Sequence, residues 1–238
     1  MKIDSKYLCI IGDIHGEFFE ISTKIYNLGL KETCFIILGD CGIGFHRRGY
    51  YEQIYPKLER RLENYNNVIL GFRGNHDDPD FFKEGGLLDF PRFKTIPDFT
   101  TLHWNDREIF VIGGAISTDK QDRLEEMMKK PKYRYKNQPR CWWPGEGVIQ
   151  DFSKIPIKAD IIVSHQAPLS VGPIVSKFDT MTTEDYESII KERKFLSRVL
   201  EQTNPKKWYF GHYHSSTSGS WGDTIWKGLS KNEIIEVK

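Results

Sequence analysis

The sequence predicts an α/β fold in which a second β-sheet packs on the first. Five near-continuous apolar runs each end at a short polar motif, and such runs are typical of strands buried on both faces. Amphipathic segments between several of these runs predict helices. A later series of short β-like segments predicts the second sheet. The 238 residues, of which 39% are hydrophobic, suit one domain, residues 1–238, with a sizeable core, although two small domains would also fit.

Strand-like and helix-like segments alternate, as they do in α/β folds. Because ligands of such proteins collect beyond the carboxyl ends of the strands, we expect the five motifs to share one rim of one sheet. Thr182 or Thr183 could cap the last helix. The apolar runs cover residues 7–11, 34–38, 67–72, 160–163 and 208–210. The helix-like segments cover residues 17–28, 48–65 and 183–202.

Six further segments are short, β-like and separated by turn residues, which predicts the second sheet. Asn105-Asp106 predicts a hairpin turn between two of them. Trp221-Gly222-Asp223 could form the turn of a final hairpin. The six segments cover residues 93–96, 100–104, 108–112, 215–220, 224–227 and 234–237.

Charge and cysteine usage indicate the kind of partner and the compartment. The net charge of +1 gives no global field that favours nucleic acid or an anionic membrane, although a local basic patch is not excluded. The four cysteines show no C-x-x-C spacing, so we expect reduced thiols in a cytoplasmic protein. The N-terminus has no apolar signal segment, and no run is long enough to span a bilayer.

Each apolar run is followed by side chains that can bind metal. Gly211-His212-Tyr213-His214 follows the last run, and in an extended segment its two imidazoles would point to the same side. Carboxylate, imidazole and amide ligands without thiolate suit manganese, iron or zinc, of which manganese is favoured. Such a set, seven ligands once His76 is set aside, is too large for one ion and suits two. Ions roughly 3.5–4 Å apart are a recurrent arrangement for phosphoryl chemistry. The polar residues at the run ends are Asp13, His15, Asp40, Asn75, His76, His165, His212 and His214.

Taken singly, these residues have plainer interpretations. Asp13 or Asp40 could cap a helix, and Asn75 could be a left-handed turn residue. His165 could be a turn residue, and the H-x-H pair alone could be two surface histidines. Five such coincidences in one order are improbable, which favours one shared metal-binding site over these separate interpretations.

The five motifs, in their order, resemble the calcineurin-like metallophosphoesterase family. The match spans most of the chain. The resemblance implies a four-layer α/β/β/α sandwich and a dinuclear metal-dependent phosphoesterase. Such an enzyme hydrolyses a phosphomonoester or a phosphodiester by attack of a metal-bound hydroxide. The motifs are Gly12-Asp13-Ile14-His15-Gly16, Gly39-Asp40, Gly74-Asn75-His76-Asp77, Ser164-His165 and Gly211-His212-Tyr213-His214.

Carried over position by position, the resemblance also implies a role for each residue. Asp40 would bridge the two ions. His76 would contact the phosphate and protonate the leaving oxygen, and Asp77 would orient the His76 ring. The first ion would be held by Asp13, His15 and His214, and the second by Asn75, His165 and His212.

One position departs from the family pattern. Many relatives continue the second motif as Gly-Asp-x-x-Asp, but Ile43 stands where the second aspartate would be. The departure puts in doubt the support around the site and any resemblance to protein Ser/Thr phosphatases. His46-Arg47-Arg48 could supply a cation near the site, or could be a solvated loop.

Residues 116–149 form a segment that is too polar for a core element and too aromatic for a linker. Its length predicts an insertion or lid that overhangs the ions. We expect Arg123 to bind phosphate, and Trp142 and Trp143 to stack on a base or ring. Arg123 follows Asp119 by four positions, so both would face one way on a helix. Alternatively, the segment is a surface flap whose tryptophans plug onto the core. It also carries Tyr133, Arg134, Tyr135 and Arg140.

The expected partner is a phosphoester substrate and not a membrane, and two rivals to a phosphatase or phosphodiesterase stay open. A nuclease of the same fold would want a basic groove, and the near-neutral charge argues weakly against it. A catalytically silent binding module would lack ligands or His76, all of which are present.

Overall fold

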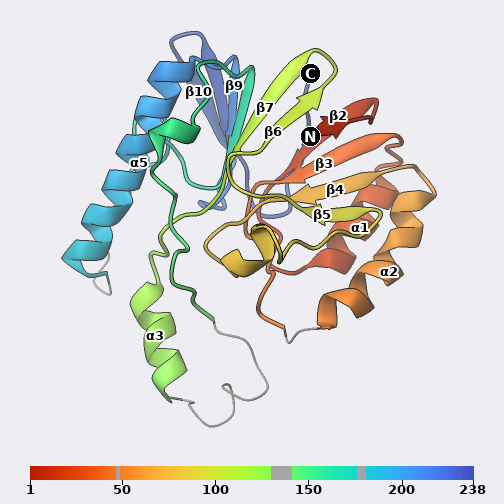
Figure 1. The fold of residues 1–238 in the computed structure, drawn as a ribbon, viewed down its shortest axis with the longest axis horizontal. Helices are drawn as coiled ribbons and strands as arrows, with labels where there is room; N and C mark the ends of the chain where they lie inside the picture. Colours follow the sequence, from red (N-terminus) through yellow and green to blue (C-terminus); the bar gives the residue numbers. More distant parts are fainter. Residues whose placement is uncertain (47–48, 130–140, 176–180) are drawn as a thin grey trace.

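Two β-sheets packed face to face form the centre of the computed structural model, which describes residues 1–46, 49–129, 141–175 and 181–238. One sheet has five strands in the order β12-β2-β3-β4-β5, and the other has seven in the order β1-β6-β7-β8-β9-β11-β10. Helices cover the outer faces of both sheets (Figure 1). The predicted four-layer α/β/β/α architecture is therefore confirmed.

Both sheets are mixed. In the five-stranded sheet, β2 to β5 are parallel and β12 is antiparallel to β2. In the seven-stranded sheet, β7, β8, β9 and β11 are parallel, whereas β6 and β10 pair antiparallel with β7 and β11. The strands of the first sheet are β2 (Tyr7–Ile11), β3 (Thr33–Ile37), β4 (Val68–Gly71), β5 (Phe93–Thr95) and β12 (Ile234–Glu236). Those of the second are β1 (Lys2–Ile3), β6 (Thr101–Trp104), β7 (Arg107–Ile112), β8 (Ile161–Ser164), β9 (Lys207–Phe210), β10 (Thr217–Trp221) and β11 (Thr224–Gly228).

Alternating side chains of the strands divide the apolar core into layers. Leu8 and Ile10 of β2 point between the sheets, where they join residues of the other sheet such as Val163. Cys9 and Ile11 point the opposite way, into a cluster with the helices. Successive residues of a strand face opposite sides, so a strand buried on both faces needs an unbroken apolar run.

Three amphipathic helices complete the outer layers. α1 and α2 lie on the five-stranded sheet, and α5 lies on the seven-stranded sheet (Figure 1). The hydroxyl of Thr182 accepts a hydrogen bond from the backbone N–H of Asp185 at 3.0 Å, so Thr182, rather than Thr183, caps α5. The bounds are α1 (Phe18–Asn27), α2 (Tyr50–Glu63) and α5 (Thr183–Thr203), with short 3-10 helices η1 (Pro79–Phe82) and η2 (Phe152–Lys154).

The strands are shared between the sheets in a way that the sequence did not predict. The expectation that the five apolar runs form one sheet is wrong, because β8 and β9 join the seven-stranded sheet while β5 and β12 extend the other. Central strands of both sheets are buried on both faces, so the apolar pattern cannot separate them. Loops at the carboxyl ends of all five runs nevertheless contact one another.

Both predicted hairpin turns are confirmed. β6 and β7 pair antiparallel around Asn105, which has a φ of 53°. β10 and β11 pair antiparallel around Gly222, which has a φ of 55°. Tight hairpins need positive φ, which glycine and asparagine adopt most readily.

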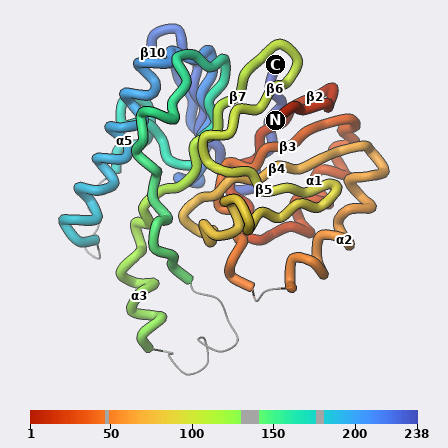
Figure 2. Tube along the Cα trace, in the orientation of Figure 1, coloured from red at the N-terminus to blue at the C-terminus, as the bar shows by residue number. Residues whose placement is uncertain are grey.

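The segment 116–149 leaves the sheets after β7. Its helix α3 (Lys120–Lys129) projects away from the body of the protein (Figure 2). Tyr133, Arg134, Tyr135 and Arg140 fall in 130–140, outside the described residues. The single-domain organisation with a lid at 116–149 therefore stays a prediction.

All four cysteines are described, and none of them is in a disulfide. Within the described part of the chain, no helix has both the length and the apolar character needed to cross a membrane.

Candidate metal centre

Five loops bring the predicted ligands together at one end of the two sheets. Asp13 and His15 follow β2, Asp40 follows β3, and Asn75 follows β4. The three remaining predicted ligands come from the other sheet, since His165 follows β8 while His212 and His214 follow β9. Side chains that lie as far apart in sequence as Asp13 and His214 are therefore neighbours in space.

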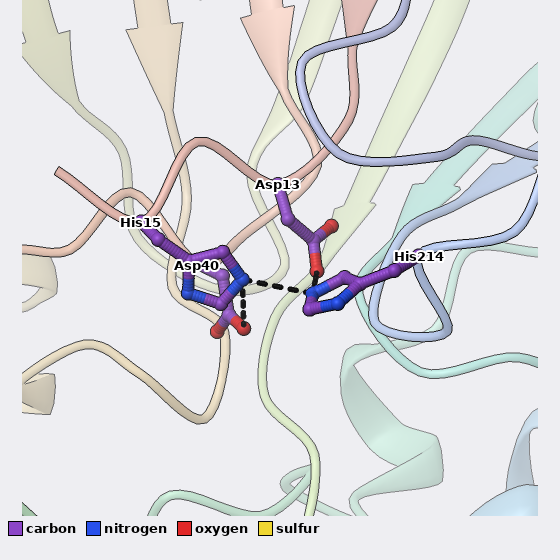
Figure 3. Close-up of side chains that lie close together, drawn as sticks. All are labelled: Asp13, His15, Asp40 and His214. Carbon is purple, nitrogen blue, oxygen red and sulfur yellow. Dashed lines mark hydrogen bonds and ion pairs between the residues drawn. The ribbon is translucent and has the colours of Figure 1, made fainter. Parts of the chain in front are cut away.

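In the first group of side chains, two imidazoles face two carboxylates. Nε2 of His15 lies 2.8 Å from Nε2 of His214, which is 3.1 Å from Oδ2 of Asp13. Nε2 of His15 also lies 3.8 Å from Oδ2 of Asp40. The ligand atoms of these four residues all lie within 4.8 Å of one another, as Figure 3 shows. This spacing and donor set suit a divalent cation.

The second group centres on the buried His165. Nδ1 of His165 lies 2.7 Å from the carbonyl oxygen of Leu38, which can only accept a hydrogen bond, so Nδ1 carries a proton. The other ring nitrogen, Nε2, lies 2.9 Å from Oδ1 of Asn75 and would be the nitrogen that faces a metal ion. The His212 ring packs on the His165 ring with centroids 4.9 Å apart. Imidazole and amide groups that could bind a metal ion thus lie side by side.

Asp40 lies between the two groups and contacts both. Its Oδ1 is 3.2 Å from Nε2 of His165, and its Oδ2 faces His15 and His76. Burial would raise the pKa of Asp40, but the neighbouring histidines hold it well below its ordinary value. Burial alone would lower the pKa of His165, but Asp40 raises it to about 9. A buried carboxylate among imidazoles favours positive charge, which cations can supply.

The ligand loops adopt backbone conformations that are rare for residues with side chains. The φ angle is 45° at His15, 47° at Asp40, 70° at His212 and 49° at His214. The expectation that His212 and His214 lie in an extended segment is therefore wrong. The loop turns because the backbone N–H of His212 donates to both carboxylate oxygens of Asp13 at 3.0 Å. As a result, His214 joins the first group and His212 joins the second.

Asp77 has different partners from the one expected. Its buried carboxylate accepts the backbone N–H groups of Cys41, Ile43 and Gly74 at 2.8 to 3.0 Å. Burial raises the pKa of Asp77 to about 7. No hydrogen bond joins Asp77 to the ring of His76, although both residues are described. Asp77 instead joins the loop after β3, which contains Cys41 and Ile43, to the loop after β4.

Arg123 of α3 lies against the His76 ring. Its Nη2 is 3.1 Å from Nδ1 of His76 and also contacts Nε2. Oδ2 of Asp119 accepts from Nε of Arg123 at 2.9 Å, so the two side chains face one way, as predicted. Burial and Arg123 together lower the pKa of His76 to about 4, against Asp40, which would raise it. The insertion thus places a cation beside the predicted acid.

The two tryptophans have different surroundings. Trp143 is buried and packs edge-on against Phe45, with ring centroids 4.9 Å apart, and Phe45 stacks on His76. Trp142 is half-buried, with Nζ of Lys120 5.5 Å from its ring centroid. Trp143 therefore supports, from the protein interior, the Phe45 ring that stacks on His76. Stacking of either ring on a substrate stays a prediction.

The segment His46-Arg47-Arg48 was expected to supply a cation near the site, and the structure describes only its first residue. His46 is exposed and stacks on Tyr50, with ring centroids 3.7 Å apart. Arg47 and Arg48 lie outside the described residues.

Two buried polar networks that adjoin the site were not predicted. Nδ2 of Asn75 donates to Oγ of Ser117 at 3.0 Å, and Ser117 bonds to Glu146. Arg73 pairs with Asp98 at 2.7 Å and donates to backbone carbonyls at the end of the insertion. Only Arg73, which directly precedes a ligand motif, carried a signal in the sequence.

Two mixed sheets packed face to face, with helices outside, carry this cluster of side chains at one end. The family model of the calcineurin-like phosphoesterases matches residues 7–216, and the chain belongs to this family. Among solved structures, the chain is similar to a protein assigned as a 5′-nucleotidase from Staphylococcus aureus, in complex with α-ketoglutarate, at 11% identity and a TM-score of 0.41. The similarity covers 96% of this chain and 49% of that chain, so this chain spans about half the length of that protein. No curated protein matches the sequence.

Proposed function

We propose that the chain hydrolyses phosphoesters at a site for two divalent metal ions, with manganese favoured over iron or zinc. Asp40 carries the proposal, because its two carboxylate oxygens face different groups of ligand-type side chains. The donor set of carboxylate, imidazole and amide, without thiolate, fits such ions. The first ion would be held by Asp13, His15 and His214, the second by Asn75, His165 and His212, and both by Asp40.

When bound, such ions supply an activated water at neutral pH and neutralise charge on a phosphate. The chain's own residues would orient the substrate and move the proton. His76, whose Nε2 is 4.0 Å from Oδ2 of Asp40, would donate a proton to the leaving oxygen. Arg123 can bind a phosphate oxygen beside it. A phosphate between the two residues would engage the guanidinium and favour the protonated form of the His76 ring.

Turnover of generic substrates tests the proposal. Metal-free protein is expected to be inactive, and added Mn²⁺ should restore hydrolysis of p-nitrophenyl phosphate, bis(p-nitrophenyl) phosphate or both. The ratio of the two rates separates a phosphatase from a phosphodiesterase. A nuclease would prefer single- or double-stranded nucleic acid to either ester. Binding of Mn²⁺ without turnover of any of these substrates would contradict the proposal and support a silent binding module.

Arg123→Ala is expected to weaken phosphate binding, because it removes the cation that contacts His76. Competitive inhibition by inorganic phosphate should weaken about tenfold or more, since a hydrogen bond to a charged group contributes about 1.5–3 kcal/mol. Lys120→Ala is the matched control, because Lys120 lies on the same helix but pairs with Asp185 at 2.7 Å. Unchanged inhibition in a less stable Arg123→Ala variant would give Arg123 a structural role only.

We further propose that residues 116–149 act as a lid, with Trp142 and Trp143 contacting a substrate that carries a base or ring. Trp142 is half-buried and could contact such a substrate directly, whereas the buried Trp143 would act through Phe45, which stacks on His76. The ratio of KM for a nucleotide to KM for an aliphatic phosphate in Trp142→Ala is the check. A ratio equal to that of the wild type would exclude stacking on Trp142.

A further inference from the structure

A buried chain of hydrogen bonds leads from Asn75 into the insertion. Nδ2 of Asn75 donates to Oγ of Ser117 at 3.0 Å, and Oγ of Ser117 donates to Oε2 of Glu146 at 2.6 Å. The other carboxylate oxygen, Oε1, accepts the backbone N–H of Ser117 at 2.8 Å. Asn75 is 2% exposed, Ser117 1% and Glu146 3%, so bulk water does not compete for these bonds.

With Glu146 ionised, the hydrogens of this chain can be arranged in one way. A carboxylate only accepts, so the hydroxyl of Ser117 donates to Glu146. The hydroxyl oxygen then offers lone pairs to Asn75, and only the NH2 end of the amide can use them. The oxygen end of Asn75 is therefore turned the other way, 2.9 Å from Nε2 of His165. Burial raises the pKa of Glu146, and the bonds from Ser117 oppose that shift.

We propose that Ser117 and Glu146 are positioning residues that present the oxygen end of the Asn75 amide to the second metal ion. This inference rests on the proposed function, in which Asn75 is a ligand of that ion. The two ends of an asparagine side chain are nearly identical in shape, but only the oxygen is a metal ligand. The hydrogen bond from Nδ2 fixes the orientation of the amide and makes its oxygen a better metal ligand, as outer partners of metal ligands do.

The two arms of the insertion that carry these residues are fixed to the body of the protein. Both carboxylate oxygens of Glu192, on α5, are engaged, because they accept the backbone N–H groups of Ile116 at 3.1 Å and Val148 at 2.6 Å. The buried Arg73 donates to the backbone carbonyl of Glu146 at 2.7 Å. The carboxylate of Glu146 is therefore held in register with Asn75 from two sides.

Titration of metal-free protein with Mn²⁺, followed by calorimetry, tests the inference. The wild type should bind two ions. Ser117→Ala removes the acceptor for Nδ2 of Asn75 and leaves the amide free to rotate. It should bind the first ion normally and the second about 10–100-fold more weakly, the usual cost of losing an outer partner. Ser117→Thr keeps the hydroxyl and should restore the second site.

Glu146→Gln is the sharper variant, because it reverses the chain of hydrogen bonds with almost no change in size. The new amide oxygen can still accept the backbone N–H of Ser117, but its NH2 group then donates to Oγ. The hydroxyl of Ser117 is then free to donate to Asn75, which favours the flipped amide with Nδ2 toward the ion. The second ion should therefore bind more weakly even if Ser117→Ala does not fold.

Glu192→Gln is the matched control, since it alters the same two arms without touching Asn75. It should keep both metal affinities, whatever its melting temperature. Wild-type binding of two ions by both Ser117→Ala and Glu146→Gln would overturn the inference and leave the proposed function intact. A wild-type protein that binds fewer than two ions would overturn the proposed function and this inference with it.

Discussion

Asp40→Asn is expected to lose both metal ions and nearly all phosphoesterase activity, while the protein remains folded. Asp40 directs one carboxylate oxygen to His165 and the other to His15, and an amide supplies one oxygen and no charge. The fold should survive because the amide oxygen can still accept the backbone N–H of His76, which donates to Asp40 at 2.7 Å. Elemental analysis after dialysis measures the metal, and circular dichroism follows the fold.

His15→Asn is the matched comparison for this variant. His15 contacts Asp40 and His214 but belongs to the first group alone. The His15→Asn variant should therefore lose one ion and retain the other. If Asp40→Asn also lost one ion only, Asp40 would not be shared between the ions. Two ions retained at wild-type affinity in Asp40→Asn would sink the assignment of the metal centre.

His76→Asn should keep both ions yet lose rate according to how poor the leaving group is. A general acid contributes about 10²–10⁴-fold where the leaving oxygen needs a proton, so alkyl phosphates should show most of that loss. A nitrophenolate leaves as a stable anion, so its ester should lose much less. The measurement is kcat over a series of esters whose leaving groups span a range of pKa.

The same series contains the outcome that would contradict this role. If kcat fell by one factor for every leaving group, His76 would only bind phosphate, because an acid acts on the leaving oxygen alone. Asparagine is the chosen replacement because it can still donate a hydrogen bond to phosphate. Metal content equal to that of the wild type must accompany either result, since His76 is not a proposed ligand.

The strands that carry the site could be predicted from their apolar runs, because an unbroken apolar run indicates a strand that is buried on both faces. Residues 7–11 and 34–38 are apolar almost throughout, and β2 and β3 are buried on both faces. The candidate ligands could be located because each follows such a run. The pattern says nothing about which strands become neighbours, which is why β8 and β9 were expected in the wrong sheet.

Contacts between distant segments lie beyond this kind of pattern. Ser117 stands 42 positions from Asn75, and no local spacing connects them. Asp77 was expected to orient His76 because an imidazole acid usually needs a partner on its other nitrogen, but its carboxylate faces the backbone of Cys41, 36 positions away. The proximity of Arg123 and Asp119 could be predicted, since residues four apart lie on the same side of a helix.

The division of the proposed ligands between two sheets would give bound metal ions a mechanical role. Under the proposed assignment, each ion would take ligands from both sheets. It would then hold together two layers that meet through an apolar core and through hydrogen bonds between their loops, such as those of His165 with Leu38 and of His212 with Asp13. Any sliding of one sheet over the other would change the spacing of the ligands, and bound metal would resist that motion. Part of the binding free energy is then folding free energy, and removal of the metal would loosen the joint between the sheets as well as silence the site.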